Sequence, residues 1–99
     1  MDGDQDPAPY RTTPVFDEKS LPAALRRDHR TKGGVWGVIR VLEGEVVLTV
    51  LDPAFEQRLT ADRCGVVLPE QPHFVTPSGP MRMQVEFYDR PPSSPRRGH

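Results

Sequence analysis

The side chains in this chain best suited to chemistry are two histidines and a glutamate that lie far apart in the sequence. His29 precedes a strand-like segment, His73 follows a proline-bounded bend, and Glu86 lies in the last strand-like segment. Imidazole is the commonest metal ligand in proteins. Two imidazoles and one carboxylate form a set that suits a divalent metal such as zinc, iron or nickel, with positions left open for water. We therefore predict a metal site at His29, His73 and Glu86.

Four further side chains are expected to line or support this pocket. An unpaired buried Glu86 would cost several kcal/mol. It therefore requires a metal, a protonated histidine, or the guanidinium group of Arg40 or Arg82. Gln84 is expected to hydrogen-bond to one of the metal-ligating side chains and so fix its orientation, as supporting groups do in metal sites. Trp36 is expected either to pack in the core or to form a pocket wall.

The last strand leaves two orientations open. Polar and apolar residues alternate along it, with Arg82, Gln84 and Glu86 on one face and Met81, Met83, Val85 and Phe87 on the other. Such alternation predicts a strand with two different faces. The polar face lies either in water or inside a cavity that holds something polar.

Short strands and turns are expected to position these side chains. Residues 35–42 alternate with period two, Glu43-Gly44 is a turn signal, and residues 45–51 are apolar almost throughout, as in a strand packed on both faces. Further short strands are expected at residues 57–60, 65–68, 73–75 and 81–88. With a short extended piece near Val15-Phe16, this makes about seven short strands separated by turns, which is typical of a β-sandwich or β-barrel.

The ordered domain is expected to span residues 14–89. Residues 1–13 and 90–99 are rich in proline and polar side chains, so we predict disordered tails there. Within the domain, Ser20 is expected to cap a short helical turn over residues 21–25. The rest of the domain is predicted to be all-β.

Composition narrows the classes of function. The chain has 13 basic and 14 acidic residues and a formal net charge of −1, so we expect no nucleic-acid partner. The basic run from Arg26 to Lys32, interrupted by Asp28, is expected to be mainly solvated surface, with phosphate binding as the alternative. The single Cys64 excludes an intramolecular disulfide and favours a reducing compartment. No apolar stretch is long enough for a signal peptide or a membrane span, so a cytoplasmic protein with no membrane contact is expected.

Several short motifs together resemble a known family. They are Leu21–Leu25, His29–Thr31, Gly34–Gly37, Val41–Gly44, Pro69–His73 and Val85–Tyr88. The pattern is similar to small cupins related to the N-terminal domain of the tellurite-resistance protein TehB and to YeaR. This resemblance, over about residues 14–89, implies a cupin-type, jelly-roll-like double-stranded β-barrel. It also implies a homodimer, a divalent metal and a tellurite- or nitrite-type stress response.

The resemblance also assigns positions to the usual cupin metal ligands. His29 matches one histidine of the first motif and His73 matches the histidine of the second. Thr31 stands where another histidine is usual, and the usual glutamate position falls close to Gly37. Two usual ligands are therefore absent. Three functions stay open: a metal-binding cupin with no assigned reaction, a non-catalytic barrel that binds a small molecule or partner protein without metal, and a cupin enzyme such as a dioxygenase.

Overall fold

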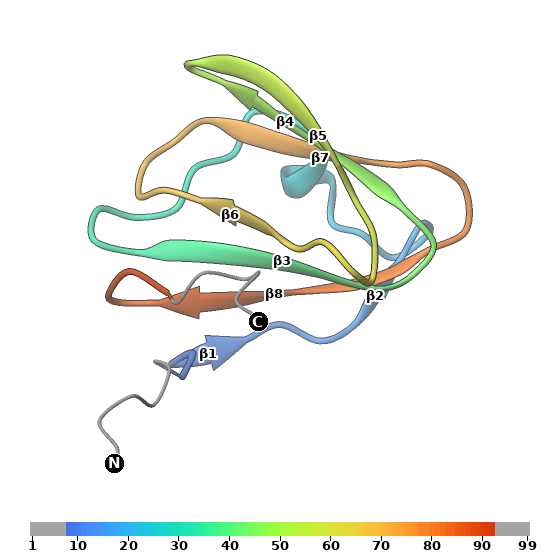
Figure 1. Ribbon diagram of the computed structural model, residues 1–99, viewed down its shortest axis with the longest axis horizontal. Coiled ribbons are helices and arrows are strands. Elements are labelled where there is room, and N and C mark those ends of the chain that lie inside the picture. The colour runs from blue at the N-terminus through green and yellow to red at the C-terminus, as the bar shows by residue number, and fades with distance from the viewer. Residues whose placement is uncertain (1–7, 93–99) are drawn as a thin grey trace.

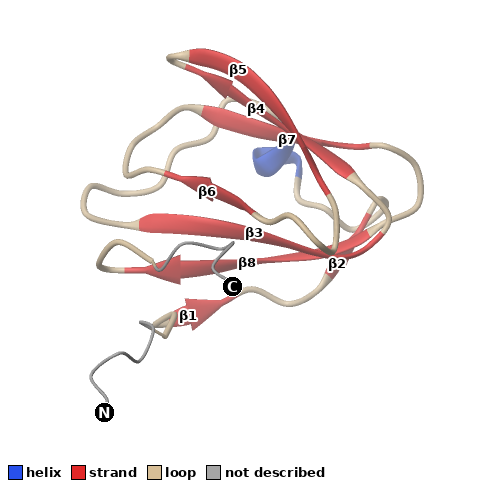
Figure 2. Ribbon diagram, in the orientation of Figure 1, coloured by secondary structure: helices blue, strands red, loops and turns tan. Residues whose placement is uncertain are grey.

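The computed structural model describes residues 8–92, and nearly all of its regular structure is β-strand (Figures 1 and 2). The strands are β1 (Arg11–Thr12), β2 (Phe16–Asp17), β3 (Trp36–Glu43), β4 (Val46–Leu51), β5 (Ala54–Leu59), β6 (Gly65–Val67), β7 (His73–Pro77) and β8 (Arg82–Tyr88). One short 3-10 helix, η1 (Ala23–Arg26), precedes β3. The predicted all-β class with a helical turn near the N-terminus is confirmed.

The strands form two antiparallel sheets. One sheet has the order β1-β8-β3-β6, with β2 also paired to β8, and the other has the order β5-β4-β7. Figure 1 shows the two sheets facing each other, with η1 near β7. Within residues 8–92 the strand pairing leaves two separate sheets, so the closed barrel that we expected is not found.

The core lies between the facing sheets and takes alternate residues from each strand. On β8 and in the turn before it, Met81, Met83 and Val85 are buried. The core continues across both sheets through Leu21, Ile39, Val41, Val46, Leu48, Val50, Leu59, Val67 and Val75. The apolar face of the last strand therefore points inward, and Arg82, Gln84 and Glu86 lie on its other face.

Gly44 joins β3 to β4, at the turn predicted from Glu43-Gly44. Its φ of +74° lies in the left-handed region that glycine adopts without steric cost. A β-carbon at this position would lie 2.3 Å from the Pro80 carbonyl oxygen. Both the backbone conformation and the close approach therefore require glycine here.

Ordered structure begins earlier than the predicted boundary at residue 14. Arg11 pairs with Phe87, Thr12 pairs with Glu86, and the Thr13 N–H donates to the Val85 carbonyl over 2.9 Å. β1 thus forms an edge of the larger sheet within the segment expected to be a tail. The tails predicted for residues 1–7 and 93–99 lie outside the described residues.

The predicted cap at Ser20 is not formed. Pro22 occupies the N-cap position of η1, which has no side-chain cap hydrogen bond. The Ser20 hydroxyl instead accepts a hydrogen bond from the Asp17 N–H over 2.8 Å, and an Asp17 carboxylate oxygen accepts from the Ser20 N–H over the same distance. Ser20 therefore stabilises the turn before the helix. No helix in the described part of the chain is long and apolar enough to cross a membrane.

Candidate binding pocket

Two backbone hydrogen bonds bring His29 and His73 together. The His29 N–H donates to the His73 carbonyl over 2.8 Å, and the His73 N–H donates to the His29 carbonyl over 2.9 Å. The imidazole centroids are 5.5 Å apart, with an angle of 82° between the ring planes. The predicted convergence of these two histidines is thus present in the structure. The segment after η1 carries His29, and the first residue of β7 is His73.

His73 is almost fully buried, with 4 % of its surface exposed. Its Nδ1 lies 2.9 Å from the Gln71 carbonyl oxygen. Burial lowers the pKa of His73 below its ordinary value, and the nearby His29 lowers it further, whereas the Gln71 carbonyl opposes the shift. Because a carbonyl oxygen only accepts hydrogen bonds, Nδ1 carries the proton of the neutral ring and Nε2 presents a lone pair.

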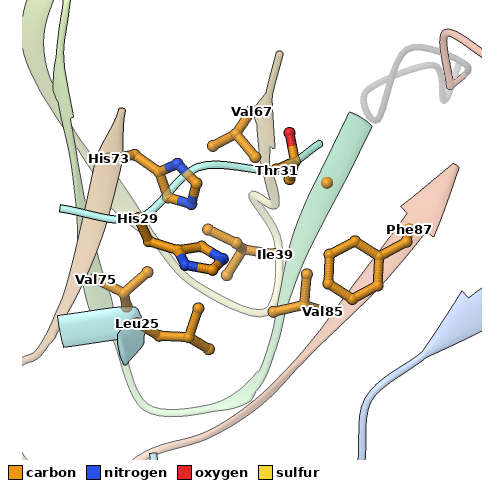
Figure 3. A pocket seen from close by; sticks show the side chains of 10 residues that line it. Leu25, His29, Thr31, Ile39, Val67, His73, Val75, Val85 and Phe87 are labelled. Carbon is orange, nitrogen blue, oxygen red and sulfur yellow. The ribbon is translucent and has the colours of Figure 1, made fainter. Parts of the chain in front are cut away.

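The two imidazoles line a small chamber between the sheets (Figure 3). Its volume is about 20 Å³. That is room for one water molecule or a group of similar size. The other walls are mostly apolar and come from η1 and both sheets: Leu25, Thr31, Gly37, Ile39, Val67, Val75, Val85 and Phe87. In Figure 3 both rings project into the same space as Ile39 and Val85.

Thr31 holds the loops around the chamber in place. Its buried hydroxyl, in a residue only 8 % exposed, donates to the Val35 carbonyl over 2.7 Å. The same oxygen accepts a hydrogen bond from the Glu70 N–H over 3.2 Å. Glu70 has a φ of +60°, a conformation that costs a non-glycine residue about 1–2 kcal/mol. Thr31 thus helps to stabilise a strained bend just before His73.

Gly37 leaves open the part of the chamber next to Thr31. A β-carbon here would lie 2.9 Å from a methyl group of Val67 and 3.7 Å from the Thr31 methyl group. The resemblance places a second histidine at Thr31 and a glutamate close to Gly37. All four positions assigned by the resemblance therefore line one chamber, although only two of them carry imidazoles.

Glu86, the third predicted metal ligand, is not brought to the histidines. Its carboxylate accepts hydrogen bonds from the Arg40 guanidinium over 3.0 Å and from the Tyr88 hydroxyl over 2.9 Å. Val85 and Phe87 line the chamber, so Glu86, between them on the strand, points to the opposite face of the sheet. The physical reason is that the apolar residues of β8 occupy the core, whereas the carboxylate pairs with a cation on the outer face.

The predicted supporting residues also lie away from the chamber. Arg40 and Gln84 are register partners on the outer face of the β3–β8 pair, and Trp36 is the register partner of Tyr88. Arg82 forms an ion pair with Glu43 over 3.4 Å. None of these four residues lines the chamber. They form part of the outer surface of the larger sheet.

Burial raises the pKa of two groups near this outer face, the Tyr88 hydroxyl and the Cys64 thiol. Burial raises the pKa of Tyr88, and the hydrogen bond to Glu86 raises it further. Burial also raises the pKa of the half-buried Cys64 thiol, although the charge of Arg40 opposes this shift. A raised thiol pKa disfavours the reactive thiolate. The raised pKa therefore favours a structural role for Cys64 over a nucleophilic one.

The donor set of the chamber does not fit the metal site that the resemblance implies. Zinc and iron sites of the expected kind use about three protein ligands. The chamber supplies two imidazoles, while Gly37 has no side chain and the Thr31 hydroxyl is bound to a carbonyl. Among residues 8–92 there is no group of three or more His, Cys, Asp or Glu side chains placed to hold one ion.

A larger open hollow lies next to the chamber, and we refer to it as the vestibule. Its volume is about 200 Å³. It is lined by Tyr10, Arg11, His29, Arg30, Thr31, Lys32, Val35 and Phe87. His29, Thr31 and Phe87 line both spaces. Our sequence predictions did not include Arg11 in any site, because it falls in the segment expected to be a tail.

The fold and this site define a small two-sheet β-protein with a water-sized chamber beside a larger open hollow, and comparison with known proteins identifies its family. The chain belongs to the TehB-like domain family, which matches residues 11–85. TehB from Haemophilus influenzae is a similar solved structure, with 27% identity over 80% of this chain and a TM-score of 0.73. The match covers only 30% of that TehB chain.

A second solved structure supports the fold. It is a protein from Escherichia coli strain K12, with 22% identity and a TM-score of 0.76. The match covers 84% of this chain and 90% of the Escherichia coli protein, so the two chains share their overall fold. No curated protein sequence matches this chain.

Proposed function

We propose that this protein is a non-catalytic binding module for a small molecule that places one small group in the His29–His73 chamber. The observation that carries the proposal is the convergence of all four cupin ligand positions on one chamber in which two of them offer no ligand. Mostly apolar walls with a few polar groups are the lining that small-molecule sites share. This lining suits an organic ligand better than a metal ion.

The imidazoles give this chamber its polar contacts. With Nδ1 of His73 held at the Gln71 carbonyl, Nε2 accepts a hydrogen bond from a ligand N–H or O–H group. His29, which pairs with His73 through an isolated antiparallel β-bridge, adds a second imidazole to the chamber. A ligand that places a small group between Gly37 and these rings would bury apolar surface and satisfy an imidazole nitrogen at once.

The family supports a wider role. We propose that the module takes part in a tellurite- or nitrite-type stress response, because TehB-like domains are related to TehB. We also propose that its two-sheet structure is a cupin variant that has lost part of the metal site. The substitution of Thr31 and Gly37 at two ligand positions supports this second point.

Thermal unfolding tests the proposed function. The protein is melted in EDTA with a panel of small organic molecules, and in parallel with zinc, iron or nickel. A ligand at about 100 times its dissociation constant stabilises the folded state by about 2.7 kcal/mol. We expect organic ligands to raise the melting temperature in EDTA, and Gly37→Val, which fills the chamber, to abolish that rise.

Two results would count against the proposal. If only a metal stabilises the protein, and His73→Ala removes that effect, the chamber is a metal site. If no compound and no metal stabilises the wild-type protein, the chamber has no small ligand of the kinds tested. Gly33→Ala is the matched control, because a β-carbon at Gly33 would meet only the flexible end of the Glu70 side chain.

A further inference from the structure

We propose that the ligand of this module is a small organic anion whose oxyanion group binds in the vestibule. This inference rests on the proposed function and adds the chemical class of the ligand. The vestibule brings together Arg11 from β1 and Arg30 and Lys32 from the segment after His29. These residues come from two segments that are far apart in the sequence.

The charge of the vestibule differs from that of the whole protein. The chain has a formal net charge of −1. Yet the described residues that line this hollow include two arginines and one lysine and no aspartate or glutamate. Asp28, which does not line the hollow, forms an ion pair with Arg30 over 4.0 Å, and both side chains are well exposed. Such a concentration of positive charge in a hollow raises the local concentration of anions.

Arginine is suited to bind an oxyanion on this surface. Its guanidinium group donates in a planar fork that matches a carboxylate or phosphate. The Arg11 guanidinium lies 6.0 Å from the centroid of the Phe87 ring, which favours a defined side-chain position through a cation–π contact. Phe87 also lines the chamber, so this cation is held at the junction of the two spaces.

The size and walls of the two spaces indicate the rest of the ligand. The vestibule volume of about 200 Å³ exceeds the roughly 150 Å³ of an engineered cavity that binds benzene. Phe87, Tyr10 and Val35 offer apolar contacts there, whereas the chamber accepts only a small group. The fitting ligand is therefore a ring-sized apolar body with one oxyanion substituent.

Calorimetric binding of matched probes tests this inference. Benzoate and benzamide have nearly the same shape but differ in charge, and sulfate carries charge without an apolar body. We expect benzoate to bind at least tenfold more tightly than benzamide and sulfate, and its affinity to fall as salt increases. Each single change, Arg11→Gln, Arg30→Gln or Lys32→Gln, should lower the affinity for benzoate about twofold to fivefold, as expected for the loss of an exposed ion pair. The triple variant should lose most of the preference.

The controls separate this inference from the proposed function. Lys19→Gln removes an exposed cation outside the vestibule and should leave benzoate binding unchanged. Equal binding of benzoate and benzamide, both abolished by Gly37→Val, would overturn the anion preference while the binding module stands. Equal binding of sulfate and benzoate would show that an apolar body adds nothing to affinity, and would overturn that part of the inference. If none of the probes binds the wild-type protein, the inferred binding site is overturned. Melting curves of the triple variant verify that this variant is folded.

Discussion

His29 and His73 exchange both of their backbone hydrogen bonds, so main-chain pairing fixes the separation of their backbones, and their ring centroids lie 5.5 Å apart. The two rings can therefore move only by rotation of their side chains. Such a preorganised pair lowers the conformational entropy that a ligand must overcome on binding. The pair is the structural basis for the chamber between the sheets.

Filling the chamber at Gly37 should block ligand binding at a moderate cost in stability. In Gly37→Ala the new methyl group would lie 2.9 Å from a Val67 methyl group. Overpacking of this kind costs about 1–3 kcal/mol. Chemical denaturation measures this cost, and calorimetry measures the loss of ligand. Unchanged ligand affinity in a folded Gly37→Ala protein would show that the ligand binds elsewhere.

Stability should fall when the pH is lowered below about 6.5, the ordinary pKa of histidine. Burial lowers the pKa of His73 in the folded state, so the unfolded chain binds its proton first as the pH falls. The stability that neutral His73 contributes is complete above the unfolded pKa and is lost as the pH falls toward and through the folded pKa. Urea denaturation between pH 7.5 and pH 5 measures this slope.

Two histidine variants identify the source of this pH dependence. His73→Gln should flatten the slope. His29→Gln should leave much of it, because burial is the largest cause of the His73 shift and the charge of His29 is a smaller one. If His73→Gln has the same slope as the wild-type protein, another group causes the pH dependence.

Gly44 and Gly34 allow a comparison between backbone strain and a steric clash. Both have positive φ, +74° and +77°, but only at Gly44 would a β-carbon meet other atoms, 2.3 Å from the Pro80 carbonyl oxygen. Gly34→Ala should cost about 1–2 kcal/mol from the left-handed backbone alone. Gly44→Ala should cost about 1–3 kcal/mol more because of the clash. Equal losses in urea denaturation would contradict the close approach at Gly44.

Glu86→Gln should separate the outer face of the sheet from the ligand site. Glu86 is 17% exposed and its partner Arg40 is 44% exposed, so their ion pair contributes only about 1 kcal/mol or less. We expect a small loss of stability in denaturation and no change in ligand affinity. A loss of ligand or metal binding in this variant would mean that Glu86 does belong to the site.

The sequence predicted the alternation of β8 but not which of its faces lies inside. The period-two pattern puts Met83 and Glu86 on opposite faces of β8. Which of these faces is buried depends on the residues of the neighbouring strands that lie against each face. Arg40 lies across from Gln84 on the outer face and gives Glu86 a partner there. An unpaired carboxylate would instead have faced apolar walls, which is unfavourable. This information is in the pairing of β3 with β8 and not in either strand alone.

Other features depended on tertiary context in the same way. β4 is apolar almost throughout, and we expected it to be packed on both faces. Only Val46, Leu48 and Val50 are fully buried, because the other face of its sheet is only partly covered. β1 has no apolar pattern and forms through backbone pairing with the edge of β8. The convergence of His29 and His73 was predicted, and the resemblance supplied the positions of Thr31 and Gly37.

The most direct test of the central claim is the nitrogen-15 spectrum of the two imidazoles during titration with benzoate and benzamide in EDTA. If the chamber binds a small organic ligand, the ring nitrogens of both His29 and His73 should shift together and saturate. The same titration of Gly37→Val should leave them unchanged. Imidazole signals that stay fixed in the wild-type protein with both probes, and that shift only when zinc, iron or nickel is added, would contradict the account.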